Sequence, residues 1–198
     1  MTLLIRPPTA EDVGTIVAFN QRLAWETEAK ALDTNTLIHG VQAVLADPHR
    51  GRYVLAELHG QVVGQLLLTW EWSDWRNGWF WWIQSVYVRA ENRQQGVFRA
   101  LYDHVLQEAR RQSDVVGLRL YVENHNIAAQ ATYHKLGLLD AGYRVLEHCP
   151  LSPATLCEER SRDSAGRLAP RPVRRHRLAG LERLVGRTRR PSTGRDTP

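Results

Sequence analysis

The chain has 198 residues and a hydrophobic content of 43%, which suits one globular domain with a sizeable core. No apolar run approaches the roughly 18 residues of a membrane span, and the start lacks a charged-then-apolar signal sequence, so we expect a cytoplasmic protein. The two cysteines, Cys149 and Cys157, are too few for a disulfide framework, and no Cys/His spacing predicts a metal site.

The net charge of +5 is unevenly distributed along the chain. Residues 150–198 hold 12 arginines against 5 acidic residues, whereas residues 1–149 hold 14 basic and 16 acidic side chains. The body, 1–149, is therefore slightly acidic, which suits a cationic substrate better than nucleic acid. The tail, 150–198, has no aromatic residue, and its composition predicts a disordered segment. An arginine-rich arm for an acidic partner or nucleic acid is the alternative for this tail.

The first half of the chain shows alternating helix and strand signals. Helices are predicted from apolar residues that recur every three or four positions, and strands from short β-branched and aromatic runs between turn residues. We predict, in order, a strand over 3–6, a helix capped by Thr9, a polar connection over 25–33, a second helix closed by Asp47-Pro48, and a hairpin of strands 53–58 and 61–69 about His59-Gly60.

The stretch from Trp82 to Tyr133 carries the clearest pattern. Its first residues, 82–88, predict a buried strand, and a polar turn then leads through Gly96 into a helix over 97–112. A strand, a glycine-bearing turn and a helix start bring several free backbone N–H groups to one point. Such a point typically binds an anion such as phosphate.

A second strand, 117–122, leads to a further helix. Asn126 can cap that helix, and Gly137 stands where a left-handed residue would end it. A last strand is predicted over 142–147. The resulting order is β, α, α, three antiparallel strands, α, β, α, β, which is a mixed α/β arrangement.

These pieces resemble the GCN5-related N-acetyltransferase family (GNAT). The chain is similar to the family's pyrophosphate loop and second signature at Arg93-x-x-Gly96-x-Phe98 and at Asn126-x-x-Ala129-x-x-x-Tyr133-x-x-x-Gly137. Phe98 departs from the pattern, because the family prefers glycine or alanine there. The resemblance covers about residues 3–148. It implies an α+β fold, with a mixed, mostly antiparallel sheet flanked by helices.

The resemblance also implies a site for acetyl-CoA as co-substrate. In the family, the strand that precedes the loop pairs with the pantetheine amides, and the loop contacts the phosphates. The cofactor-binding residues expected from it are Val86, Val88, Arg93, Gln94, Gln95, Gly96, Val97, Phe98, Arg99 and Asn126. Tyr133 is the family's usual general acid, since a phenol of pKa near 10 can protonate a leaving thiolate whose thiol has a pKa of about 8.5.

The base and the acceptor are less well specified. An alkylamine of pKa near 10.4 is about one part in a thousand neutral at pH 7, so a carboxylate should help to activate it. The strand over 82–88 carries none, and Glu26 and Glu28 rank ahead of Glu71 and Asp74. We expect acetyl transfer to a primary amine of a small molecule or peptide by direct attack. A non-catalytic acyl-CoA-binding sensor or scaffold module is the alternative.

Two further features leave alternatives open. Six of the seven tryptophans fall between Trp70 and Trp82, either as cross-strand packing or as an aromatic wall beside the amine. Many GNAT proteins form homodimers, and no motif in this sequence decides for or against one.

Overall fold

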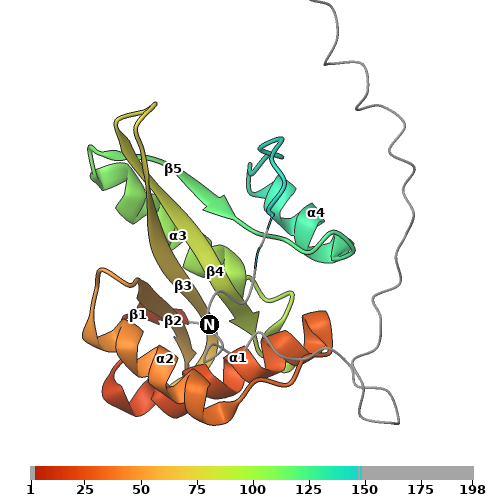
Figure 1. Cartoon of the computed structure of the whole chain (residues 1–198). Helices are drawn as coiled ribbons and strands as arrows, with labels where there is room; N and C mark the ends of the chain where they lie inside the picture. Colours follow the sequence, from red (N-terminus) through yellow and green to blue (C-terminus); the bar gives the residue numbers. More distant parts are fainter. Residues whose placement is uncertain (1–2, 147, 149–198) are drawn as a thin grey trace, which may run out of the picture. The chain divides into compact units, whose positions relative to one another are not determined.

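A computed structural model describes residues 3–146 and 148 (Figure 1). The elements are β1 (Leu3–Arg6), η1 (Ala10–Asp12), α1 (Val13–Glu28), α2 (Thr34–Ala46), β2 (Arg52–Leu58), β3 (Gln61–Ser73), β4 (Gly78–Val88), η2 (Ala90–Asn92), α3 (Val97–Arg111), β5 (Val115–Leu120) and α4 (Ile127–Lys135). The sheet order is β1-β2-β3-β4-β5, antiparallel throughout except for the parallel pair β4 and β5. The predicted mixed, mostly antiparallel α+β fold is confirmed. The tail, 150–198, lies outside the described residues.

Helices pack on both faces of the sheet (Figure 1). One core cluster joins α1 and α2 to the sheet, and the other joins α3 to it. Along β2, Tyr53 and Leu55 belong to the first cluster, whereas Val54 and Ala56 belong to the second. Successive side chains of a strand point to opposite faces, so β2 is buried on both sides. Val97, at the start of α3, is buried in the second cluster.

The tryptophan-rich hairpin of β3 and β4 is longer than the sequence predicted. Trp70 lies opposite Trp81 and Trp72 opposite Trp79. The ring centroids of these pairs are 5.3 and 5.0 Å apart in edge-to-face geometry, which is a favourable aromatic arrangement. Cross-strand packing is therefore confirmed for these four rings.

The predicted polar connection over 25–33 is wrong in its first half. The helix α1 continues through Glu28, and Ala29 ends it in a left-handed conformation with φ of 51°. No glycine or proline interrupts the chain there, and alanine and glutamate are good helix formers. Glu26 and Glu28 therefore lie on the last turn of α1 rather than in a loop.

The predicted last strand over 142–147 is also wrong. Residues 142–146 belong to no strand, and residue 147 lies outside the described residues. Tyr143, Val145 and Leu146 are exposed by 70% or more. A β-branched and aromatic run forms a strand where it can pack against a neighbouring strand or face, and the described residues provide no such neighbour for it.

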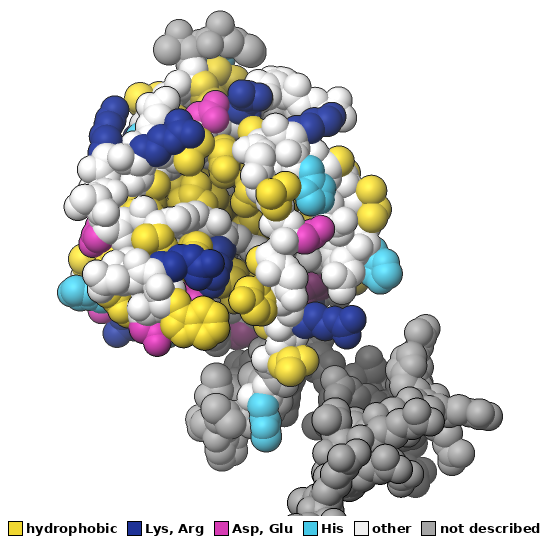
Figure 2. Space-filling model, turned by 90° about the horizontal axis from the view of Figure 1, so that it is seen from above, with side chains coloured by type: hydrophobic (Ala, Val, Ile, Leu, Met, Phe, Trp, Pro, Cys, Tyr) yellow, Lys and Arg dark blue, Asp and Glu magenta, His cyan; other side chains and the backbone are white. Residues whose placement is uncertain are grey.

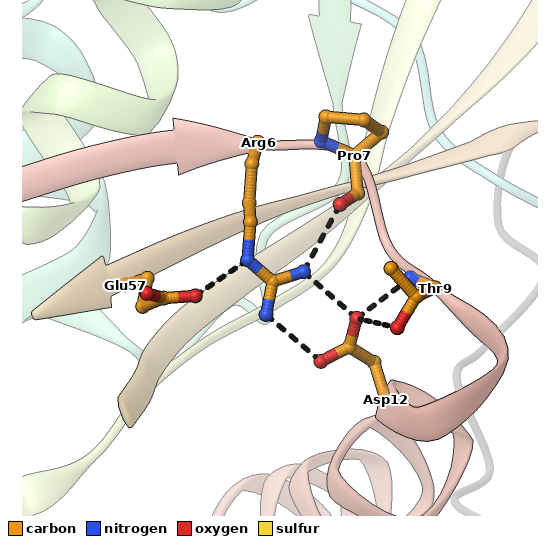
Figure 3. Close-up of polar contacts among 5 residues, drawn as sticks. All are labelled: Arg6, Pro7, Thr9, Asp12 and Glu57. Atoms are coloured by element: carbon orange, nitrogen blue, oxygen red, sulfur yellow. Dashed lines mark hydrogen bonds and ion pairs between the residues drawn. The ribbon is translucent and has the colours of Figure 1, made fainter. Parts of the chain in front are cut away.

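A cluster of ion pairs ties β1 to the start of the first helices (Figure 3). The Arg6 guanidinium donates to Glu57 at 2.5 Å and to the two carboxylate oxygens of Asp12 at 2.8 and 3.0 Å. Asp12 also accepts from the backbone N–H of Thr9 at 2.7 Å. The hydrogen bond from Arg6, helped by those from Thr9, lowers the pKa of Asp12 from 3.8 to about 2.

We expect Asp12→Asn to lower the free energy of unfolding by about 2 kcal/mol at pH 7, because each unit of pKa shift corresponds to about 1.4 kcal/mol. The folded-state pKa is depressed, so this stabilisation is present above about pH 4 and is lost as the pH falls through about 2. Urea unfolding of wild type and variant should show a difference at pH 3 that is about half that at pH 7. Glu11→Gln, at an exposed neighbouring position, is the control. An equal difference at both pH values would contradict the assignment.

Candidate functional site

The strand β4 carries a bulge in its second half. In the register with β3, Leu67 lies opposite Gln84 and Gln65 lies opposite Tyr87. Between these pairs, Ser85 and Val86 of β4 lie opposite the single residue Leu66 of β3. Ser85, in this bulge, has φ of 48°, a left-handed conformation that is uncommon for a residue with a side chain.

The strands β4 and β5 separate at the same point. Their parallel pairing ends at Ile83 and Leu120, so in the described part of the chain no strand pairs with the β5-facing edge of β4 at Val86 and Val88. Backbone groups on such an edge can pair with an extended ligand. From the side of the β3–β4 turn and α4, the surface is hollowed, with hydrophobic side chains inside and Lys and Arg side chains around it (Figure 2).

The loop after β4 builds the predicted helix start. Gly96 is the N-cap of α3 with φ of 80°, and Gln94 is also left-handed, with φ of 62°. The first N–H groups of a helix lack intrahelical partners and carry partial positive charge, which suits an anion. The side chain of Gln95 donates back to the loop backbone. Arg99 pairs with Asp103 one turn later at 3.4 Å.

Arg93 connects this loop to the end of α1. Its Nη2 donates to Glu26 at 2.5 Å, and its Nε donates to the Val88 carbonyl at 3.0 Å. The other carboxylate oxygen of Glu26 accepts from the Tyr87 hydroxyl at 3.1 Å. A phosphate bound at the start of α3 would therefore compete with Glu26 for this guanidinium.

Tyr133 lies on α4 and contacts Phe98. The two ring centroids are 5.4 Å apart in edge-to-face geometry, so the residue that departs from the family pattern packs against the candidate acid. Burial raises the pKa of the Tyr133 hydroxyl, which keeps it protonated at neutral pH. Asn126 caps α4 by accepting from the Ala129 N–H at 3.1 Å, as predicted, and Gly137 follows the helix with φ of 89°.

A pocket of about 270 Å³ opens beside the bulge. It is lined by α1, the α1–α2 connection, α2 and β4, through Asn20, Leu23, Ala24, Thr27, Glu28, Lys30, Leu32, Leu37 and Ser85. Glu28 therefore belongs to the pocket, whereas Glu26, two residues earlier, bonds to Arg93. The wall combines aliphatic side chains with polar and charged ones, as in a site for a small polar molecule.

The two remaining carboxylates proposed from the sequence lie on the hairpin. Glu71 accepts from the Trp82 indole at 2.5 Å and from Arg119 at 2.7 Å. Trp82 stacks on Tyr121, with ring centroids 4.4 Å apart. Asp74 accepts from a backbone N–H in the turn. Glu71 is thus part of a partly exposed ion pair between β3 and β5.

Two buried polar residues near the bulge were not predicted from the sequence. Asn20 lies on α1 and Gln65 on β3, and both are buried. The signal available for Gln65 was a polar residue inside the apolar run 62–70. A polar side chain at such a position needs a partner, because burying it unpaired costs free energy.

Within residues 3–146 and 148, no helix is long and apolar enough to cross a membrane. In the same part of the chain, no group of three or more His, Cys, Asp or Glu side chains could hold a metal ion.

Comparison with known proteins identifies acetyltransferases that are similar to this chain. A family described as "Acetyltransferase (GNAT) family" matches residues 13–138. A solved structure of a possible acetyltransferase from Clostridium difficile 630 is 42% identical, with a TM-score of 0.71, and the match covers 77% of this chain and 100% of that one. A predicted acetyltransferase from Clostridium acetobutylicum, solved with acetyl-CoA, shares the fold at 16% identity and a TM-score of 0.62, over 74% of this chain and 96% of that one. No curated protein matches. The chain belongs to the GNAT family of acetyltransferases.

Proposed function

We propose that the protein transfers the acetyl group of acetyl-CoA to the primary amine of a small molecule. The observation that carries this proposal is one continuous unit: the free edge of β4 at Val86 and Val88, the helix start at Gly96, and the protonated Tyr133 beside Phe98. The edge suits the pantetheine amides and the helix start suits the phosphates. Acetyl-CoA, when bound, supplies the thioester carbonyl that the amine attacks.

Tyr133 is the proposed general acid. The amine nitrogen bonds to the thioester carbon, the carbon–sulfur bond breaks, and the sulfur receives the phenolic proton. The amine loses one proton to a base. The pocket favours Glu28 for this step, directly or through water, because Glu28 lines the space beside Ser85. Glu26 becomes a second candidate once a phosphate has replaced it on Arg93.

The pocket also supports a small acceptor. Its volume of about 270 Å³ lies just below the range of sites for drug-sized ligands, about 300–1,000 Å³. Leu23, Leu32 and Leu37 give it aliphatic walls. Its charged lining residues are Glu28, which can attract an ammonium group, and Lys30, which carries the opposite charge. A peptide with an exposed terminal amine is the other substrate class. The side chains of such a peptide would have to extend beyond this pocket.

Calorimetry with acetyl-CoA, followed by a thiol-release assay over small amines and short peptides, tests the proposal. We expect binding of acetyl-CoA and release of CoA thiol with at least one small amine. Binding without release over the whole panel would favour the non-catalytic acyl-CoA-binding module, which is supported by the lack of any acidic residue on β4. Absence of acetyl-CoA binding would overturn both functions.

A further inference from the structure

Gln65 is a polar side chain at the centre of the sheet, and it is 0% exposed. Its amide nitrogen donates to Asn20 Oδ1 on α1 at 2.7 Å and to the Ser85 carbonyl in the bulge of β4 at 3.3 Å. Asn20 in turn donates to the Tyr53 hydroxyl on β2 at 3.1 Å. A continuous hydrogen-bonded network therefore links β2, α1, β3 and the bulge.

The geometry identifies Gln65 as a donor. A backbone carbonyl can only accept, so the amide nitrogen must be the atom that faces Ser85. The amide oxygen of Gln65 accepts no hydrogen bond from any of the residues that the structure describes. Such an unpaired buried acceptor costs free energy. A leucine would avoid this cost and would still fill the space, so packing alone does not account for a glutamine here.

Gln65 bonds to the backbone carbonyl of Ser85, a residue with an unfavourable backbone conformation. Ser85 has φ of 48°, and a strained residue of this kind persists only where its surroundings hold it in place. The pairing of β4 with β5 has already ended at Ile83. The bond from Gln65 to the Ser85 carbonyl therefore acts where β4 changes course, immediately before Val86.

The same network reaches both halves of the candidate site. Asn20 and Ser85 line the pocket proposed for the amine, and the strand beyond Ser85 offers the free edge proposed for the pantetheine. Gln65 is bonded to both residues. Its own side chain does not line the pocket, so it can influence the reaction only through Asn20 and Ser85.

We propose that Gln65 is a positioning residue for acetyl transfer, which holds the β4 bulge so that the thioester and the amine meet in a reactive alignment. This inference rests on the proposed function. Small displacements of reacting atoms can lower rates about 100-fold, whereas the phosphates are held separately, at the start of α3. Loss of Gln65 therefore affects kcat more than the affinity for acetyl-CoA.

Gln65→Leu tests this role, because it keeps the volume of the side chain and removes both hydrogen bonds. We expect kcat to fall about tenfold or more, while the Kd for acetyl-CoA measured by calorimetry changes by less than about threefold. Tyr102→Phe is the control, since Tyr102 is buried on α3 and lies outside this hydrogen-bonded network. Its kcat should equal that of wild type.

Amide hydrogen exchange at Tyr87 and Arg89, which pair with β3 beyond the bulge, provides a readout that does not need turnover. Exchange should be faster in Gln65→Leu than in wild type and unchanged in Tyr102→Phe. If Gln65→Leu does not fold, Gln65→Met, an unbranched side chain of similar length, replaces it.

The outcomes separate this inference from the function on which it rests. Equal kcat in wild type and Gln65→Leu, equal losses in both variants, or unchanged exchange at Tyr87 and Arg89 would overturn the positioning role. A wild-type protein that acetylates no amine would overturn the proposed function, and hydrogen exchange would then still decide whether Gln65 holds the bulge.

Discussion

Tyr133→Phe should lower kcat about 100-fold, near the lower end of the range for a general acid, and leave the affinity for acetyl-CoA unchanged. The substitution keeps the ring that packs edge-to-face against Phe98 and removes only the hydroxyl. The thiol of CoA is itself fairly acidic, with a pKa of about 8.5, so its thiolate can leave without a proton, though more slowly. Steady-state thiol release and calorimetry measure the two quantities separately.

The pH profile gives a second check of the same assignment. A general acid must be protonated, so wild-type turnover should fall as the pH rises through the pKa of Tyr133. Burial raises this pKa above its ordinary value of 10.0, so the fall should lie at strongly alkaline pH and should be absent in Tyr133→Phe. Tyr102→Phe is the control, because Tyr102 also lies beside Phe98 but has no proposed role. Equal turnover of wild type and Tyr133→Phe in a chemistry-limited assay would refute the assignment.

Gly96→Val should weaken acetyl-CoA binding about tenfold or more. A tenfold rise in Kd corresponds to a loss of about 1.4 kcal/mol of binding free energy. Gly96 has φ of 80°, and a Cβ there would meet no atom within 4 Å. Position 96 therefore favours glycine because of its backbone conformation and not because a larger side chain would clash. Valine in the left-handed region is strained by roughly 1–2 kcal/mol, and a backbone that relaxes this strain moves the N–H groups proposed to hold the phosphates.

Gly60→Val separates binding from stability in that experiment. Gly60 lies in the β2–β3 turn with φ of 75°, and a Cβ at this position would likewise meet no atom within 4 Å. Both variants should lose a similar amount of stability in urea unfolding, because both place valine in the same strained region. Only Gly96→Val should lose affinity in calorimetry. Equal affinity losses, or none in Gly96→Val, would rule out the helix start as the phosphate site.

Local signals explain what could be predicted from the sequence. The start of α3 depends on a strand, a loop and Gly96 within a few residues, and the cap of α4 depends on Asn126 three residues before Ala129. Both were predicted correctly. The hairpin about His59-Gly60 was also correct, because its turn residues are adjacent and both adopt positive φ.

Long-range contacts explain what could not be predicted. The bond between Arg93 and Glu26 joins residues 67 positions apart, and the bulge at Ser85 depends on how β4 aligns with β3. Neither leaves a periodic pattern in the sequence. The strand expected over 142–147 failed for a related reason, since alternation does not reveal whether a neighbouring strand is present. The cytoplasmic location and the disordered tail stay predictions, and the sequence does not decide whether the protein forms a homodimer.

The tryptophan hairpin determines what optical methods can report about this protein. Six of the seven indoles lie between Trp70 and Trp82, and two pairs have ring centroids only 5.3 and 5.0 Å apart. Intrinsic fluorescence and the coupled indole transitions in circular dichroism therefore follow the melting of β3 and β4. Trp25, 64% exposed, is the exception, since it precedes Glu26 on α1. A protein that retains Trp25 alone would emit light from the last turns of α1.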